Sequence, residues 1–143
     1  MSTFNAPLRV GVNGTSTSGW VLTAQTANVV YGDNGTALTM SLPRPYHIID
    51  FQTDVLTPFN DTGTDLLAIG VTGTTDAFAA ALDLSAAGRV LASSDASQLA
   101  NYVDLTVGAP IDVVLTYTGA NSDASAGSAR VTMLYMTPIT PTS

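Results

Sequence analysis

The chain has 143 residues, of which 45% are hydrophobic and only 10% are charged, and its formal net charge at pH 7 is −7. This length and hydrophobic content can build a domain with a buried core, but an acidic chain with four scattered arginines lacks the basic patch that nucleic acid or an anionic membrane would need. Cysteine is absent, which excludes disulfides, thiolate nucleophiles and zinc–thiolate sites.

Lysine and glutamate are also absent, although both are good helix formers that usually cover exposed helix faces. Threonine and valine, which favour pleated and half-buried surfaces, are abundant instead. The first ten residues, MSTFNAPLRV, lack the pattern of a secretory signal, and no apolar run approaches the roughly 20 residues that span a bilayer. We therefore expect a β-rich protein with no export signal and no membrane partner.

Residues 1–45 are predicted to form an extended N-terminal arm that becomes a short hairpin or two edge strands. The stretch GVNGTSTSGW has the glycine and small polar residues of a loop. Asn34-Gly35 lies between the apolar runs ANVVY and TALTMSL and is typical of a tight hairpin turn. Leu38, Met40 and Leu42 alternate on one face, and Pro43 and Pro45 are expected to end the ladder.

Residues 46–143 are predicted to form the main domain, beginning with the strand HIIDFQTDVL. In this strand we expect Ile49, Phe51, Thr53 and Val55 to face the core, because side chains of a strand alternate between its two faces. The following FNDTGTD is predicted to be a loop, and DLLAIGV a short buried strand. The segment TTDAFAAALDL is predicted to be the one short helix, since alanine favours helices.

The C-terminal third shows the clearest alternation. The stretches LANYVDLTV, IDVVLTYT and ARVTMLYM each place apolar residues at every second position. Many short strands with turn residues every 8–12 residues or so indicate an all-β fold, an antiparallel β-sandwich that is jelly-roll-like. The residues predicted to alternate on one face of their strand are Leu99, Asn101, Val103, Leu105, Val107, Ile111, Val113, Leu115, Tyr117, Val131, Met133 and Tyr135.

Few residues suit catalysis. His47 is the single histidine, and no Gly-x-Ser-x-Gly or phosphate-binding loop accompanies it. Asp50 and Asp54 share a strand face, but a spacing of four residues places their backbones ~13 Å apart, too far for a pair of glycosidase carboxylates. Asx-turns explain the oxygen-rich loops FNDTGTD and NSDAS better than calcium does. We therefore predict no enzyme activity, no cofactor and no metal.

Two stretches, HIIDFQTDVLTPFNDTGTDLLAIGVTGTTDAFAAALDL and IDVVLTYTGANSDASAGSARVTMLYM, resemble small structural proteins encoded in the head gene clusters of tailed bacteriophages. The resemblance covers residues 46–136 and contains no catalytic motif. It implies a capsid decoration (cement) or head structural protein with a β-sandwich fold, a homo-oligomeric state and no cofactor.

On this reading the chain clamps neighbouring major capsid subunits on the exterior of the virion, after synthesis in the host cytoplasm, and associates with itself as a trimer or dimer. The alternative is a carbohydrate-binding or adaptor module of a phage tail or surface structure, in which exposed aromatic residues would contact sugar. The hypothesised contacts with the capsid or with other subunits are Phe4, Leu8, Arg9, Val10, Trp20, Val21, Leu22 and Arg44.

Overall fold

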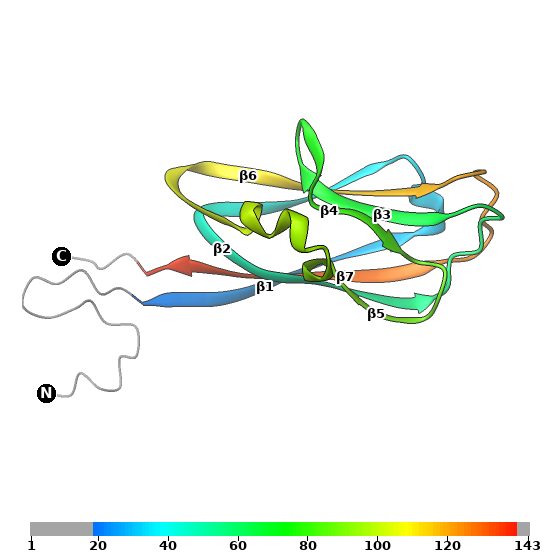
Figure 1. Ribbon diagram of the computed structural model, residues 1–143, viewed down its shortest axis with the longest axis horizontal. Coiled ribbons are helices and arrows are strands. Elements are labelled where there is room, and N and C mark those ends of the chain that lie inside the picture. Colours follow the sequence, from blue (N-terminus) through cyan, green and yellow to red (C-terminus); the bar gives the residue numbers. More distant parts are fainter. Residues whose placement is uncertain (1–18, 140–143) are drawn as a thin grey trace, which may run out of the picture.

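Antiparallel strands make up most of the protein (Figure 1). The computed structural model describes residues 19–139, and within them no helix is long and apolar enough to cross a membrane. Three short 3-10 helices, η1 to η3, join the strands. In chain order the elements are β1 (Trp20–Val30), η1 (Tyr31–Asp33), β2 (Ala37–Thr57), β3 (Asp65–Val71), β4 (Thr74–Asp83), β5 (Gly88–Leu91), η2 (Ala92–Ser94), η3 (Ala96–Tyr102), β6 (Val103–Gly119) and β7 (Ser128–Pro138).

Strand β2 belongs to both layers of the fold. Its first half, residues 37–47, pairs with β6, whereas its second half, residues 47–57, pairs with β7 and, near its end, with β5. The strand bends between these halves, so that the sheet β4-β3-β6-β2 faces the sheet β1-β7-β2-β5 (Figure 1). The predicted all-β antiparallel sandwich is confirmed.

The core lies between the two sheets, where the predicted alternation is confirmed in β7 and in the second half of β6. The predicted strand LANYVDLTV is wrong in its first part, because Leu99 and Asn101 lie in helix η3, and the side chains of Val103, Leu105 and Val107 that follow are exposed. Val113, Leu115 and Tyr117 of β6 are buried, as are Val131 and its inward neighbours on β7. Aromatic rings fill the centre: the ring of Phe51 lies 5.3 Å from that of Phe78 and 6.1 Å from that of Tyr102. Apolar burial between the sheets is therefore the main stabilising contribution.

A β-bulge in β2 changes which isoleucine is buried. The pairing with β7 shifts between Ile48 and Asp50, so the strand gains one residue there. Ile48 is consequently buried and Ile49 is 44% exposed. The prediction that Ile49 faces the core is wrong, while the predictions for Phe51, Thr53 and Val55 are confirmed.

The predicted helix over residues 74–84 is also wrong, because this segment is strand β4, paired with β3. Phe78 is buried against Phe51 and Tyr102, and this packing outweighs the helix preference of the alanines. The helical turns come later, in η2 and η3. Asp95 caps η3 by accepting a hydrogen bond from the Ser97 N–H at 3.2 Å.

The first strands are part of the sandwich. Strand β2 runs without interruption through the predicted boundary between residues 45 and 46. Pro43 and Pro45 do not end the strand as predicted, since register shifts accommodate them. Gly35, with φ of +76°, forms the predicted turn, but β1 and the first half of β2 enter different sheets instead of pairing as a hairpin. Residues 1–18 of the predicted arm lie outside the described residues.

One buried hydroxyl allows a test of the core. Thr53 is fully buried, and its Oγ1 has no hydrogen-bond partner among the described residues. An unpaired buried polar group costs about 1–3 kcal/mol. We expect Thr53→Val, which replaces the hydroxyl with a methyl group, to raise the free energy of unfolding by about 1 kcal/mol in urea titrations. Thr53→Ser retains the hydroxyl and should lower the free energy of unfolding. A higher free energy of unfolding in the serine variant would contradict this explanation.

Candidate functional site

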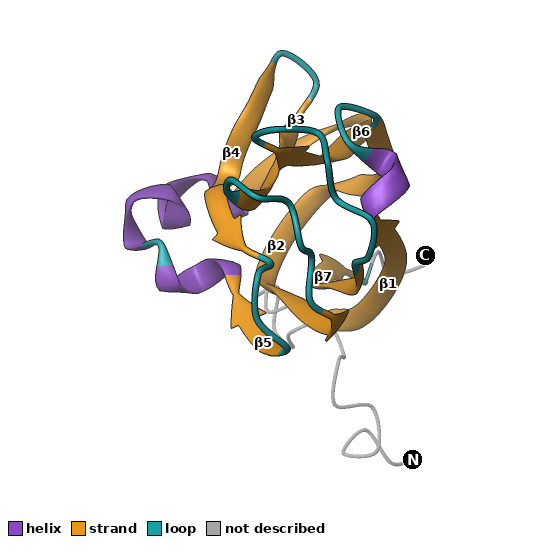
Figure 2. Cartoon of the chain, turned by 90° about the vertical axis from the view of Figure 1, so that its right-hand side faces the viewer, coloured by secondary structure: helices purple, strands orange, loops and turns teal. Residues whose placement is uncertain are grey.

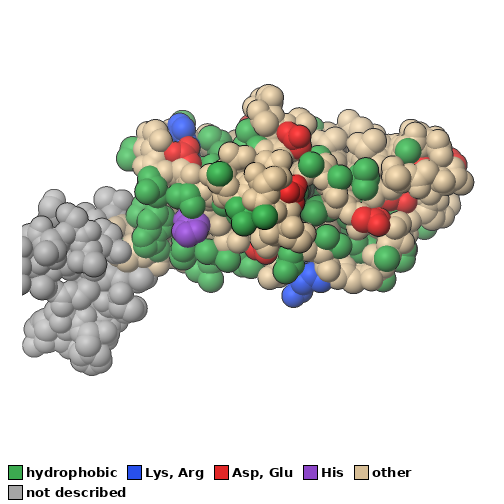
Figure 3. All heavy atoms as spheres, in the orientation of Figure 1, with side chains coloured by type: hydrophobic (Ala, Val, Ile, Leu, Met, Phe, Trp, Pro, Cys, Tyr) green, Lys and Arg blue, Asp and Glu red, His purple; other side chains and the backbone are tan. Residues whose placement is uncertain are grey.

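Exposed apolar side chains gather at one end of the sandwich (Figure 3). Leu22 of β1 pairs with Met136 of β7, Met136 with His47 of β2, and His47 with Val103 of β6. Residues that are directly opposite across neighbouring strands share a face of the sheet, and the adjacent Tyr135 and Ile48 are buried. The row of four therefore faces outward. We call the following six residues the apolar end: Leu22, Ile49, Val103, Leu105, Val107 and Met136.

The most exposed part of the apolar end is the start of β6. Val103, Leu105 and Val107 are 43%, 62% and 84% exposed. They alternate along the strand and so share its outward face. Large apolar side chains in such a contiguous group are the usual mark of an interaction surface.

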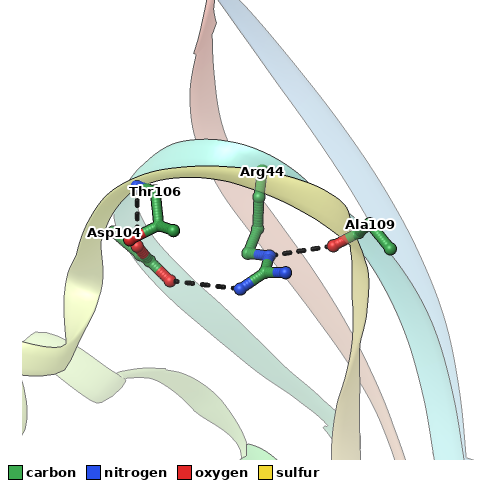
Figure 4. Close-up of polar contacts among 4 residues, drawn as sticks. All are labelled: Arg44, Asp104, Thr106 and Ala109. Carbon is green, nitrogen blue, oxygen red and sulfur yellow. Dashed lines mark hydrogen bonds and ion pairs between the residues drawn. The ribbon is translucent and has the colours of Figure 1, made fainter.

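Arg44 holds the start of β6 in place from the other side (Figure 4). Its Nε donates a hydrogen bond to the carbonyl oxygen of Ala109 at 2.8 Å, and its Nη1 lies 3.9 Å from Asp104 Oδ2. A Cβ atom at Gly108 would lie 2.3 Å from the guanidinium, so glycine leaves the room that Arg44 occupies. Hydrogen bonds from Thr106 and, to a smaller extent, the charge of Arg44 lower the pKa of Asp104.

The sequence-predicted contact residues fall in three places. Phe4, Leu8, Arg9 and Val10 lie outside the described residues. Trp20, Val21 and Leu22 begin β1, and Leu22, which is 62% exposed, belongs to the apolar end. Arg44 is engaged with Asp104 and Ala109 within the chain.

The sequence does not identify Val103, Leu105 and Val107 as surface residues, because they continue the odd-numbered alternation of the buried Val113 and Leu115. Between the pairs Leu42–Ile111 and His47–Val103, β2 advances five residues and β6 eight. The three extra residues of β6 reverse which parity faces the core. Gly108-Ala-Pro110 at this point is the signal that could have indicated the reversal.

The two carboxylates that were considered for catalysis are engaged within the chain. Asp50 accepts hydrogen bonds from the backbone and hydroxyl of Ser93, and Asp54 pairs with Arg89 at 2.7 Å. Two open hollows, of about 350 Å³ and about 400 Å³, share Tyr46 and Asp104 in their lining, but His47 lines neither. Within residues 19–139, no group of three or more His, Cys, Asp or Glu side chains is placed to hold a metal ion.

The oxygen-rich loops meet at the end opposite the apolar end, where Asp61 joins them. Its carboxylate accepts hydrogen bonds from the backbone N–H groups of Gly63 at 2.7 Å, Asn121 at 3.0 Å and Asp123 at 3.1 Å. Burial acts to raise the pKa of Asp61, but these donors outweigh it and hold the pKa below its ordinary value. The oxygens considered for calcium thus serve as acceptors that join two loops.

This lowered pKa predicts a pH dependence. Asp61 stabilises the fold fully above the ordinary carboxyl pKa of about 4, and the contribution disappears as pH falls through the lower pKa of the folded state. We expect Asp61→Asn to lower the melting temperature at pH 7. Between about pH 4 and pH 2 the melting temperature of this variant should decrease less than that of the unaltered protein. Asp76→Asn changes an exposed carboxylate without a described hydrogen bond and is the control. Equal pH profiles for the two variants would contradict the assignment.

Aromatic side chains form no exposed platform in the described part of the chain. Tyr46, Tyr102, Tyr117 and Tyr135 are 5% exposed or less, and Tyr31 stands apart at 43%. Tyr117 donates a hydrogen bond to the buried Asp65 at 2.6 Å, and burial together with this bond raises its pKa above the ordinary range. The four buried tyrosines are therefore core residues.

Together, fold and surface define an all-β sandwich protein with one apolar end and a polar, hydrogen-bonded opposite end. No protein-family model matches the chain, and no curated protein matches it. Among solved structures, a chain of the "Cyanophage Pam1 capsid asymmetric unit" is similar, with a TM-score of 0.63 and 17% sequence identity over 93% of this chain and 96% of that chain. At this identity the likeness shows a shared fold.

Proposed function

We propose that the chain is a non-enzymatic structural protein of a phage virion that decorates the capsid exterior and stabilises it by clamping neighbouring major capsid subunits. The observation that carries the proposal is the fold likeness, which extends over 93% of this chain and 96% of the other. The surface supports the proposal, because the described residues offer an apolar end for binding.

The apolar end is the proposed capsid contact. Burying one large aliphatic side chain fully is worth about 1.5–3 kcal/mol, so a few of them give useful affinity. The described chain begins and ends here, since the Ile139 N–H donates a hydrogen bond to the Gly19 carbonyl oxygen. Phe4, Leu8, Arg9 and Val10, which precede Gly19 in sequence, are also proposed as capsid contacts. Arg44 is included through the exposed part of its side chain.

Binding to the shell would also stabilise the protein and the shell together, because a partner that binds only the folded state shifts the folding equilibrium toward it. The proposal includes synthesis in the host cytoplasm, addition to the outside of the head, and a homo-oligomeric state, dimer or trimer. It requires no cofactor and no contact with nucleic acid.

The test uses heads assembled from the major capsid protein of the same genome, in expanded form and without this chain. Full-length protein should co-sediment with these heads at saturable stoichiometry, add density to their outer surface in cryo-electron microscopy, and raise their disruption temperature. Failure to bind expanded heads would overturn the proposal. A deletion of residues 1–18, which leaves β1 intact, should weaken binding; full binding by the deleted form would remove the arm from the contact.

A further inference from the structure

Strand β1 forms an open edge of its sheet. It pairs with β7 from Trp20–Pro138 to Val30–Ser128 without a register shift, and no other described strand pairs with its far side (Figure 2). An edge strand presents a row of unpaired N–H and C=O groups that another strand can use.

The free groups can be assigned residue by residue. The Gly19 carbonyl accepts from Ile139 N, and Tyr31 N donates to the Gly127 carbonyl, so the odd-numbered residues face β7. The backbone N–H and C=O groups of successive residues point to opposite sides of a strand. The backbone groups of the even-numbered residues therefore point away from β7. The Val30 N–H is taken by Asp33 Oδ2 at 2.9 Å, which ends the open row. The residues with free backbone groups are Trp20, Leu22, Ala24, Thr26 and Asn28, of which the last four are exposed.

Two other edges carry the usual protections against pairing. Strand β5 has only four residues, and its Arg89 is ion-paired with Asp54. The first half of β2 contains Pro43 and Pro45 at register shifts. Short length, charge, proline and bulges are the devices by which natural sheets avoid edge-to-edge association.

The edge at β4 is protected as well. It carries two aspartates and irregular pairing with β3. Helix η3 covers it: Asn101 Nδ2 donates to the Ala77 carbonyl at 2.8 Å, and the Tyr102 hydroxyl donates to the Phe78 carbonyl at 3.0 Å. Strand β1, by contrast, has 11 residues and contains no charge, proline, glycine or bulge.

We propose that β1 is a self-association edge, on which β1 of a second copy of this chain pairs antiparallel about a twofold axis at Ala24. This register uses all five open residues: Trp20 lies opposite Asn28 of the second copy, Leu22 opposite its Thr26, and Ala24 opposite its Ala24. Each opposed pair exchanges two hydrogen bonds, about ten in all. The two sheets join into one continuous sheet across the dimer.

Charge and symmetry select a second copy as the occupant. With a net charge of −7 per chain, two copies repel through most surfaces, but β1 brings no charged residue opposite another. A twofold contact also closes on itself, so it yields a dimer and no fibre. The inference goes beyond the capsid role and is tested on the free protein, so it can fail or hold independently of that role.

Sedimentation velocity of the full-length protein tests the association. We expect a species of twice 14.7 kDa at micromolar concentration. The Ala24 N–H faces away from β7, so Ala24→Pro removes no bond within the chain and should weaken dimerisation by about tenfold or more. Ala24→Ser keeps the N–H and should dimerise normally. A monomer at ~100 μM, or a trimer, would overturn the proposal, as would dimers of the proline variant at unchanged affinity.

Cross-linking tests the register. The chain has no cysteine, so each variant carries a single thiol. Opposed residues of a hydrogen-bonded antiparallel pair have Cα atoms about 5.5 Å apart, within disulfide range. Ala24→Cys should therefore oxidise rapidly to a covalent dimer, whereas Thr26→Cys, which faces Leu22 of the second copy, should oxidise much more slowly. Equal rates, or faster oxidation of Thr26→Cys, would contradict the proposed twofold axis.

Discussion

Phe51→Ala is expected to lower the free energy of unfolding by about 3–5 kcal/mol, the range for deleting a buried aromatic ring. Phe51 is fully buried where β2 crosses the core, and its ring contacts those of Phe78 and Tyr102. Phe78 belongs to β4 and Tyr102 to η3, so the same ring joins elements from both layers. Equilibrium urea unfolding, followed by fluorescence and circular dichroism, measures the loss.

Two comparisons make this prediction specific. Phe51→Leu retains most of the volume and should lower the free energy of unfolding by much less than the alanine variant. Leu56→Ala removes a side chain that is 58% exposed on the same strand, so it should change the free energy of unfolding little. A loss below about 1 kcal/mol in Phe51→Ala would show that the ring cluster is not central to the fold.

The strands of the C-terminal third could be predicted because their burial is decided locally. In β7, Val131, Met133 and Tyr135 are inward in both sequence pattern and structure, since a regular strand between two neighbours keeps its period of two. The predicted sandwich follows from this pattern repeated over several segments. Alternation also identified Phe51, the residue with the largest expected effect.

Other features could not be predicted, because they depend on contacts between distant residues. The bulge at Ile48–Asp50 exists to fit β2 against β7, and a single sequence contains no mark of that fit. Strand β4 is an alanine-rich segment whose conformation is decided by β3 and by the ring of Phe51. Likewise, nothing near Asn34-Gly35 indicates that β1 and the first half of β2 enter different sheets.

The candidate site was predicted in part. Trp20, Val21 and Leu22 were selected for their apolar character, and of these Leu22 belongs to the apolar end while the other two precede it in β1. The start of β6 was predicted to continue the apolar face of a regular strand. The extra residues near Gly108 turn the odd-numbered side chains before them outward, so that prediction did not identify them as surface residues. A surface patch is assembled from four strands, so its members can be recognised only when the pairing is known.

The start of β6 gives the largest expected effect on binding. Changing both Leu105 and Val107 to aspartate should lower the affinity for expanded heads by about 100-fold, since two buried aliphatic contacts are lost and two charges must be desolvated. Both side chains are more than half exposed, at 62% and 84%, so the fold should keep its melting temperature within a few degrees. Co-sedimentation with heads over a concentration series measures the affinity.

Leu56→Asp is the matched control, because Leu56 is 58% exposed, close to the 62% of Leu105, and lies near the C-terminal end of β2, whereas His47 lies at its middle. If the apolar end makes the capsid contact, this variant binds heads like the unaltered protein while the double variant does not. If both variants lose binding equally, added negative charge on an acidic chain is responsible. If neither loses binding, the shell contacts a different surface, and the exposed row from Leu22 to Val103 requires another partner.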